Sequence, residues 1–161
     1  MKPIFLLSAL LFVFVSCSKS DEGPTRSEIL REGTWKINSY KIKYYSRSLD
    51  KDSIFQILDT YPDCKKGDRL RFDDSYFGSI LNGDTKCSPE EPEEIQFEWE
   101  FTNNQNGLRF HHAEYAIGRP DLSVNILRMQ ENLVNLSFQE EYDIDMDDTV
   151  DHISYAIELT R

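Results

Sequence analysis

The chain of 161 residues leaves room for one domain once a short N-terminal export segment is set aside. It has 29 acidic against 18 basic residues, a net charge of -11, which disfavours nucleic acid and anionic lipid head groups as partners because both attract clusters of Lys and Arg. Hydrophobic residues make up 39% of the chain, including ten Phe, eight Tyr and two Trp, and they suffice for a single core.

Residues 1–16 have the pattern of a secretory signal peptide. Lys2 supplies the positive charge at its start, and residues 4–15 are an apolar run. At about 1.5 Å per residue this run covers about 18 Å, too short for a hydrocarbon core about 30 Å thick. Residues 14–17, Phe-Val-Ser-Cys, resemble the lipobox of bacterial lipoproteins. The resemblance implies that Cys17 is acylated and becomes the mature N-terminus; the alternative is an ordinary signal peptide with an incidental cysteine.

Residues 17–27 are expected to hold the lipidated cysteine and a flexible acidic tether. The segment 18–24 is small, polar and acidic, a composition that favours an extended, solvated chain. An acidic cluster directly after a lipidated cysteine is similar to the export tag of some surface lipoproteins. We therefore expect a lipid-anchored protein of the outer membrane, either at the cell surface or on the periplasmic face.

Cysteine usage agrees with an exported protein. If Cys17 is lipidated, Cys64 and Cys87 remain, and an oxidising compartment favours a disulfide between them. Such a bridge closes a loop of about two dozen residues and stabilises the fold by about 3 kcal/mol. A metal site is the alternative, but the chain has no CxxC pair or nearby His to supply further ligands.

Two short segments are expected outside the strands. Residues 27–32 fit one helical turn, with Ser27 as N-cap and Gly33 ending it. Residues 47–58 are ambiguous, because their apolar spacing fits a helix, while the segment could equally be a loop that caps one end of a barrel.

The first expected strand covers residues 34–45, rich in β-branched and aromatic residues. Trp35 and Ile37 share one face of a regular strand, whereas Tyr40 and Ile42 fall on the other. This change of face predicts a β-bulge or strong coiling, which small barrels use to close.

Seven further strands follow, joined by short polar turns. The alternation of apolar and polar residues is cleanest over residues 95–101. We find no internal repeat, no convincing long helix and no second domain. We therefore expect residues 28–161 to form an all-β, eight-stranded antiparallel up-and-down barrel, monomeric in solution. The seven further expected strands cover residues 69–73, 76–81, 95–101, 108–112, 122–129, 133–141 and 150–159.

Several segments resemble a known family. Residues 33–36, Gly-Thr-Trp-Lys, resemble the GxW start of lipocalins. Four later segments are similar to the bacterial lipocalin-like domain of lipid-anchored proteins: residues 61–66, 69–72, 83–89 and 155–161. The resemblance implies a lipocalin-like barrel of the calycin type and a disulfide between Cys64 and Cys87. It also implies that Gly33 and Trp35 build the base, where Trp35 plugs the closed end.

Aromatic residues at inward positions are the candidate ligand-lining set: Phe97, Trp99, Phe101, Phe110 and Tyr155. The interior of an eight-stranded barrel is either filled by its own side chains or holds one small ligand. The first case predicts a structural or protein-interaction module that uses the loops 47–61 and 112–121. The second predicts a protein that binds or carries a small apolar molecule, the function that we favour.

Other chemistry is weakly indicated. Asp143, Asp145 and Asp147 alternate as calcium ligands do, but the residues that an EF-hand loop needs for its turn and its bidentate carboxylate are replaced. His111 and His112 are neighbours in an expected strand, so they face opposite sides and cannot chelate one metal. No catalytic motif is present, so we expect no enzyme activity, no cofactor and no resident metal.

Overall fold

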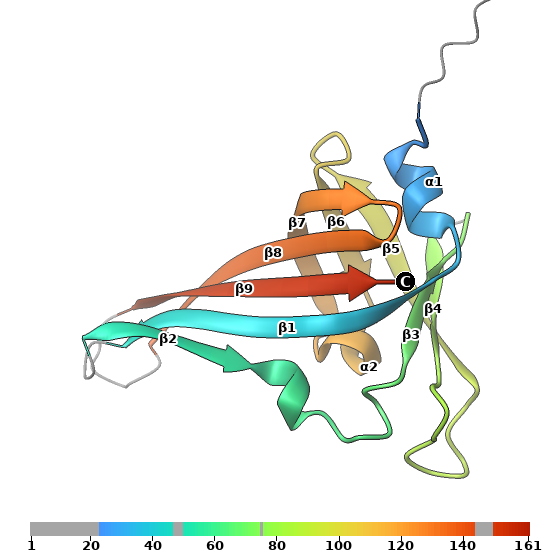
Figure 1. Cartoon of the computed structure of the whole chain (residues 1–161), viewed down its shortest axis with the longest axis horizontal. Coiled ribbons are helices and arrows are strands. Elements are labelled where there is room, and N and C mark those ends of the chain that lie inside the picture. The colour runs from blue at the N-terminus through green and yellow to red at the C-terminus, as the bar shows by residue number, and fades with distance from the viewer. Residues whose placement is uncertain (1–22, 47–49, 75, 144–149) are drawn as a thin grey trace, which may run out of the picture.

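The structure is a computed structural model that describes residues 23–46, 50–74, 76–143 and 150–161 (Figure 1). The helices in these ranges are α1 (Arg26–Arg31), the 3-10 helix η1 (Ile57–Thr60) and α2 (Glu114–Ile117). The strands are β1 (Thr34–Ser46), β2 (Lys51–Gln56), β3 (Arg69–Phe72), β4 (Phe77–Leu81), β5 (Glu94–Thr102), β6 (Gly107–His111), β7 (Asp121–Gln130), β8 (Leu133–Tyr142) and β9 (Asp151–Thr160).

Eight of these strands form a closed antiparallel barrel. Their order is β1-β3-β4-β5-β6-β7-β8-β9, and pairing between β1 and β9 closes the ring. This confirms the all-β, eight-stranded barrel expected from the sequence. Each barrel strand begins and ends within one residue of its expected range, because alternation along a half-buried strand marks its ends closely.

β2 lies outside the ring and pairs only with the second half of β1, from Lys41 to Ser46. β3 pairs with β1 only from Thr34 to Lys36, so β1 runs well past the part that β3 covers. The chain then turns back as β2, which forms hydrogen bonds with the backbone groups of β1 that β3 leaves unpaired. Residues 47–58, which fitted a helix or a loop, therefore contain a strand that leads into η1.

A β-bulge in β1 keeps its apolar side chains on one side. Ile37 pairs with Leu159 and Ser39 with Glu158, so Asn38 is an extra residue without a counterpart on β9. Because of this insertion Tyr40, only 2% exposed, lies in the interior together with Trp35 and Ile37. The bulge expected from the change of face is confirmed.

Helix α1 covers the closed end of the barrel. Its N-cap is Thr25, which forms a capping box with Glu28, so the expectation that Ser27 is the N-cap was wrong by two residues. Gly33 follows the helix with a φ of +77°, a conformation that glycine adopts without strain. Trp35 is fully buried beneath α1, and its indole Nε1 donates a hydrogen bond of 2.8 Å to the carbonyl of Leu30. Gly33 and Trp35 therefore lie at this end of the barrel, where Trp35 packs under α1.

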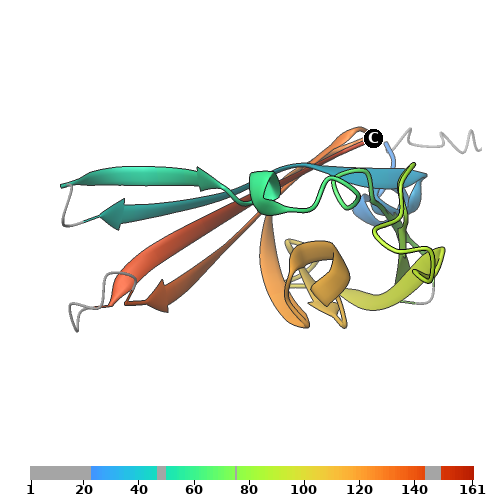
Figure 2. The ribbon, with the colours of Figure 1, turned by 90° about the horizontal axis from the view of Figure 1, so that it is seen from below.

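At the other end of the barrel, the long strands run beyond the short ones. Figures 1 and 2 show β2, β1, β9 and β8 extending together past the barrel body as a four-stranded projecting sheet. The face of this sheet that continues the barrel interior is the part of the molecule where the candidate site lies.

Candidate functional site

The barrel body is filled by its own aromatic side chains. Phe72 lies at the centre, with its ring centroid 5.7 Å from that of Phe97 and 5.3 Å from that of Trp99. The rings of Phe97 and Phe110 are 6.0 Å apart, and all four residues are at most 5% exposed. The indole Nε1 of Trp99 donates a 2.9 Å hydrogen bond to the carbonyl of Phe77, which fixes its ring. These contacts are those of a packed core.

The body is also closed where the projecting sheet begins. Before and within α2, the side chains of Ala113, Ala116 and Ile117 are buried at 7% exposure or less. Beneath this helix, beside Leu58 and Tyr61, the remaining space is about 20 Å³, far below the roughly 300–1,000 Å³ of small-molecule pockets. A small organic ligand therefore does not fit at this point.

The five candidate lining residues separate into two groups. Phe97, Trp99 and Phe110 belong to the packed core, and Phe101 lies half-buried against Trp99 with their ring centroids 5.5 Å apart. Tyr155 lies elsewhere, on the projecting sheet, where its ring stacks on Phe138 at 4.2 Å. Of the five, Tyr155 alone lines the open surface described next.

That open surface, which we call the mouth, is the inward face of the projecting sheet. Strand register defines it, because residues directly opposite each other on neighbouring strands share a face. Ile42 lies opposite Phe55 of β2 and Tyr155 of β9, and Tyr44 lies opposite Ile153. On β8 the same face carries Phe138, Glu140 and Tyr142, which lie opposite Tyr155, Ile153 and Asp151.

The mouth is apolar and partly uncovered. Phe55 is 51% exposed and Tyr142 is 66% exposed, while Tyr40 and Tyr155 at the base of the mouth are buried. A hollow of about 490 Å³ opens there, lined by Tyr142, Ile153 and Tyr155 together with Arg119, Glu140 and Glu141. This volume is in the range of small-molecule pockets.

A charged pair lies at the base of the mouth. Arg119 follows Gly118, which ends α2 with a φ of +72°. Its guanidinium binds both carboxylate oxygens of Glu140, with 2.7 Å between Nη2 and Oε2. It also lies 5.3 Å from the ring centroids of Phe138 and Tyr155, and Nη2 donates a 3.4 Å hydrogen bond to the Tyr155 hydroxyl. Bidentate binding and two aromatic rings thus fix the guanidinium.

The surroundings keep the polar groups of the mouth in defined protonation states. Burial raises the pKa of Tyr155 to about 12, and the hydrogen bond and charge of Glu140 add to this effect. Burial likewise raises the pKa of Tyr40. For Arg119 burial acts to lower the pKa, but the hydrogen bond and charge of Glu140 outweigh it and leave the pKa raised. At neutral pH the mouth therefore presents uncharged phenols beside one internally neutralised ion pair.

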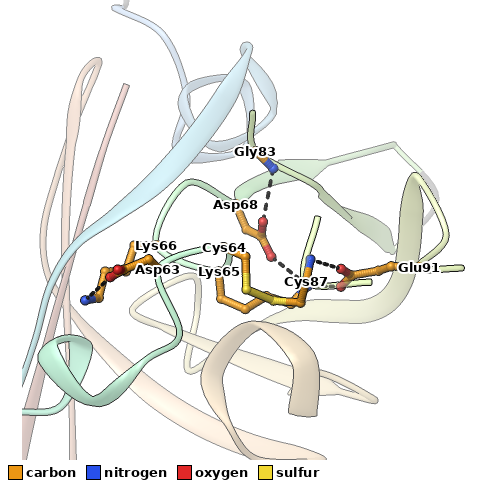
Figure 3. Close-up of a disulfide and its surroundings, with 8 residues drawn as sticks. All are labelled: Asp63, Cys64, Lys65, Lys66, Asp68, Gly83, Cys87 and Glu91. Atoms are coloured by element: carbon orange, nitrogen blue, oxygen red, sulfur yellow. Dashed lines mark hydrogen bonds and ion pairs between the residues drawn. A yellow bond between two sulfur atoms is a disulfide. The ribbon is translucent and has the colours of Figure 1, made fainter. Parts of the chain in front are cut away.

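The expected disulfide joins two loops at the same end of the barrel (Figure 3). Cys64 precedes β3 and Cys87 precedes β5, and their Cα atoms are 5.2 Å apart. Because both cysteines are bonded to each other, they do not bind a metal.

Ion pairs surround the bridge and hold the two loops together. Lys65 forms ion pairs with Glu91 and, at 3.3 Å, with Asp68. The amide of Cys87 donates a 2.9 Å hydrogen bond to Glu91, and the amide of Gly83 donates a 3.0 Å hydrogen bond to Asp68. The hydrogen bond and charge of Lys65 lower the pKa of Glu91 despite burial. This cluster is a structural support for the two loops that the disulfide joins.

The remaining candidates do not come together as a site. Asp143 directly follows β8, whereas Asp145, Asp147 and the lipidation candidate Cys17 lie outside the described residues. Within the ranges described, no group of three or more His, Cys, Asp and Glu side chains could hold a metal ion. His111 lies 2.6 Å from Asp121 on the outer surface. His112 lies beyond the end of β6 with a φ of +57°, so its placement in a strand was wrong.

Comparisons with family models, with curated proteins and with solved structures find no match for this chain. In the part of the chain that the structure describes, no helix is long and apolar enough to cross a membrane. The fold defines a closed eight-stranded antiparallel barrel with a packed body and an open apolar mouth, and any function has to be argued from that geometry.

Sequence reasoning missed the residues that form the mouth: Ile42, Tyr44, Phe55, Arg119, Glu140, Tyr142 and Ile153. One signal was available for Glu140. Glu140 follows Val134, Leu136 and Phe138 at every second position of β8, so a carboxylate occupies a position where the alternation predicts a buried apolar side chain. For Arg119 the sequence offers no such signal, because it lies in a loop whose path depends on α2.

Proposed function

We propose that this protein is a lipid-anchored, lipocalin-like protein of the cell envelope that binds a small, largely apolar molecule at its mouth. The proposal is supported by the apolar inner face of the barrel, which continues beyond the packed body. It continues over the projecting sheet through Ile42, Tyr44 and Phe55, where no other part of the described chain covers it fully. Exposed aromatic side chains in a concave, preformed hollow favour a ligand with an apolar body.

The expected anchor would leave this site accessible. The chain enters α1 at the closed end of the barrel, opposite the mouth (Figure 1). A lipid on Cys17 would therefore attach the barrel to the membrane by its closed end. A tether of about seven residues reaches at most about 25 Å, so it would hold the closed end of the barrel near the membrane surface.

Native mass spectrometry tests the proposal. Among the described residues, every buried apolar residue lies between Ile29 and Leu159, so a soluble domain of residues 18–161 retains this core. Exported to the periplasm by an ordinary signal peptide, this domain is expected to carry an added mass of a few hundred daltons under native but not denaturing conditions. A domain that carries no added mass, and gains none on incubation with envelope lipid extract, would contradict the proposal.

Two neighbouring residues of β2 give a matched pair of variants. Phe55 and Ile54 are both exposed and apolar, 51% and 68%, but they lie on opposite faces of the sheet. Covering half of a Phe ring is worth about 1 kcal/mol, so Phe55→Ser should weaken ligand retention about fivefold. Ile54→Ser, which changes the outer face, should leave it unchanged. Equal effects of the two substitutions would place the ligand elsewhere.

A protein-interaction module is the second candidate, favoured by the free edge of β2. This strand pairs on one side with β1 and has no strand on its other side among the described residues. An exposed edge with apolar side chains can pair with a strand of another protein. In that case the domain carries no added mass, and both Ile54→Ser and Phe55→Ser reduce the yield of a cross-linked complex in the envelope.

A further inference from the structure

We infer that the mouth selects uncharged molecules and rejects anionic ones, because its arginine is already neutralised by Glu140. The inference rests on the proposed function, since it concerns which ligands the same site accepts. The mouth is expected to bind neutral apolar molecules and to exclude molecules that carry a carboxylate, sulfonate or phosphate.

Arg119 is the cation that an anionic ligand would meet at the base of the mouth. Both of its terminal nitrogens are engaged by Glu140, and the Tyr155 hydroxyl and two ring faces occupy the space around them. To reach the guanidinium, an anion would have to displace Glu140. The carboxylate of Glu140 would then lose its partner in a site that is only about one-third exposed, 35% for its side chain.

The other charged groups of the projecting sheet leave the pair of Arg119 and Glu140 intact. Lys41 and Lys43 lie on the outer face, and Lys43 pairs with Asp52 at 2.6 Å. Glu141 also lines the hollow and lies 3.4 Å from His152. Two further charged residues lie on the inward face by strand register: Lys51, opposite Ser46, and the buried Asp151, opposite Tyr142.

A neutral ligand meets no such penalty. Its apolar body can cover Phe55, Tyr44 and Ile153. The Tyr155 hydroxyl, which lines the hollow, remains protonated because burial raises its pKa. It can therefore exchange a hydrogen bond with a hydroxyl, carbonyl or amide of the ligand without a change of charge.

Two fluorescent probes with the same ring system provide the test. N-phenyl-1-naphthylamine is neutral, and 8-anilinonaphthalene-1-sulfonate adds a sulfonate to the same naphthalene and phenyl rings. The mature soluble protein, residues 18–161, is titrated with each probe, and the ratio of the two dissociation constants is compared between variants. Glu140→Gln removes the charge that neutralises Arg119 but keeps a side chain of the same shape. This substitution is expected to tighten binding of the sulfonate probe at least tenfold and to change binding of the neutral probe less than threefold.

Asp52→Asn is the control, because it removes a carboxylate charge from an ion pair with Lys43 on the outer face of the projecting sheet. It should change neither dissociation constant more than twofold. If Asp52→Asn tightens binding of the sulfonate probe as much as Glu140→Gln, net charge alone is responsible and the inference fails. If Glu140→Gln leaves the ratio of the two constants unchanged, the inference fails while binding at the mouth still stands. If the unmodified protein binds neither probe, the proposed function fails as well.

A second variant gives a result even if Glu140→Gln does not fold. The double variant Arg119→Gln, Glu140→Gln removes both charges of the pair, so the net charge of the mouth stays the same. If Glu140 already neutralises Arg119, this variant should change binding of the sulfonate probe less than threefold. A loss of more than tenfold for the sulfonate probe alone, with the neutral probe unaffected, would mean that Arg119 binds anions in the unmodified protein and would overturn the inference.

Discussion

The guanidinium of Arg161, the last residue of the chain, lies 4.5 Å from the centroid of the Trp35 ring, near the start of the first strand. The same guanidinium donates a hydrogen bond to the carbonyl of Ile29 and forms an ion pair of 3.0 Å with Glu32. Trp35 in turn donates to Leu30. The first strand, the last strand and α1 are therefore held together at one point, and this point closes the barrel end opposite the mouth.

Replacing Arg161 with Ala should lower the free energy of unfolding by about 1–2 kcal/mol. The loss combines a partly desolvated cation–π contact with a charged hydrogen bond to the Ile29 carbonyl. Urea unfolding followed by Trp fluorescence measures it. Arg109→Ala is the control, since Arg109 pairs with Glu100 on an exposed surface and should contribute less than about 0.5 kcal/mol. Equal effects of the two substitutions would contradict the role of Arg161 at the closed end.

The fold could be predicted from the sequence because its information is local. In β5 the buried residues Phe97 and Trp99 alternate with Glu98 and Glu100, and such a pattern has one reading, a strand with one face inward. The bulge at Asn38 was also visible, since the apolar residues of β1 change parity there. A strand that stabilises only an edge, as β2 does, leaves a weaker pattern because both its faces are exposed.

The mouth could not be predicted because it is formed by residues that lie far apart in the sequence and meet only in the folded barrel. Nothing in the chain indicates that Arg119 reaches Glu140, or that β1, β8 and β9 extend together beyond the short strands of the barrel. Phe97, Trp99 and Phe110 were chosen as candidate lining residues for their inward position. Inward position alone does not distinguish a filled interior from a hollow one, and here Phe72 completes a packed cluster with them.

Reduction of the Cys64–Cys87 bridge should destabilise the domain by about 3 kcal/mol, as expected from the loop-closure entropy of the 23-residue separation. Urea midpoints with and without a reductant measure this effect. The double variant Cys64→Ala, Cys87→Ala is the control, because its midpoint should match that of the reduced protein and should not respond to the reductant. An unmodified protein whose midpoint ignores the reductant, with both thiols shown to be free, would contradict the prediction.

Gly78→Ala should destabilise the barrel body by about 1–3 kcal/mol. A Cβ atom at this position would lie 2.3 Å from the Phe97 ring and 2.8 Å from the carbonyl oxygen of Arg71, so the core ring and the strand would have to shift. The melting temperature and the near-UV circular dichroism of Trp99 report the change. Gly23→Ala is the control, since nothing lies within 4 Å of a Cβ there and the melting temperature should not change. A fully stable Gly78→Ala protein would mean that Phe97 is not packed against this strand.

The buried tyrosines should make the protein lose stability at alkaline pH. Burial raises the pKa of Tyr155 to about 12 and also raises the pKa values of Tyr40 and Tyr61, whereas an unfolded tyrosine titrates near pH 10. The folded state thus holds these protons more tightly, so their contribution is complete below about pH 10 and is lost as the pH rises toward 12. Urea unfolding between pH 8 and pH 12 should show this decline, and absorbance at 295 nm should show phenolate forming later in the folded than in the unfolded protein. Tyr155→Phe should flatten the decline, because it removes the group with the largest shift. Coincident phenolate titrations of the folded and unfolded protein would contradict the burial of these hydroxyls at the base of the mouth.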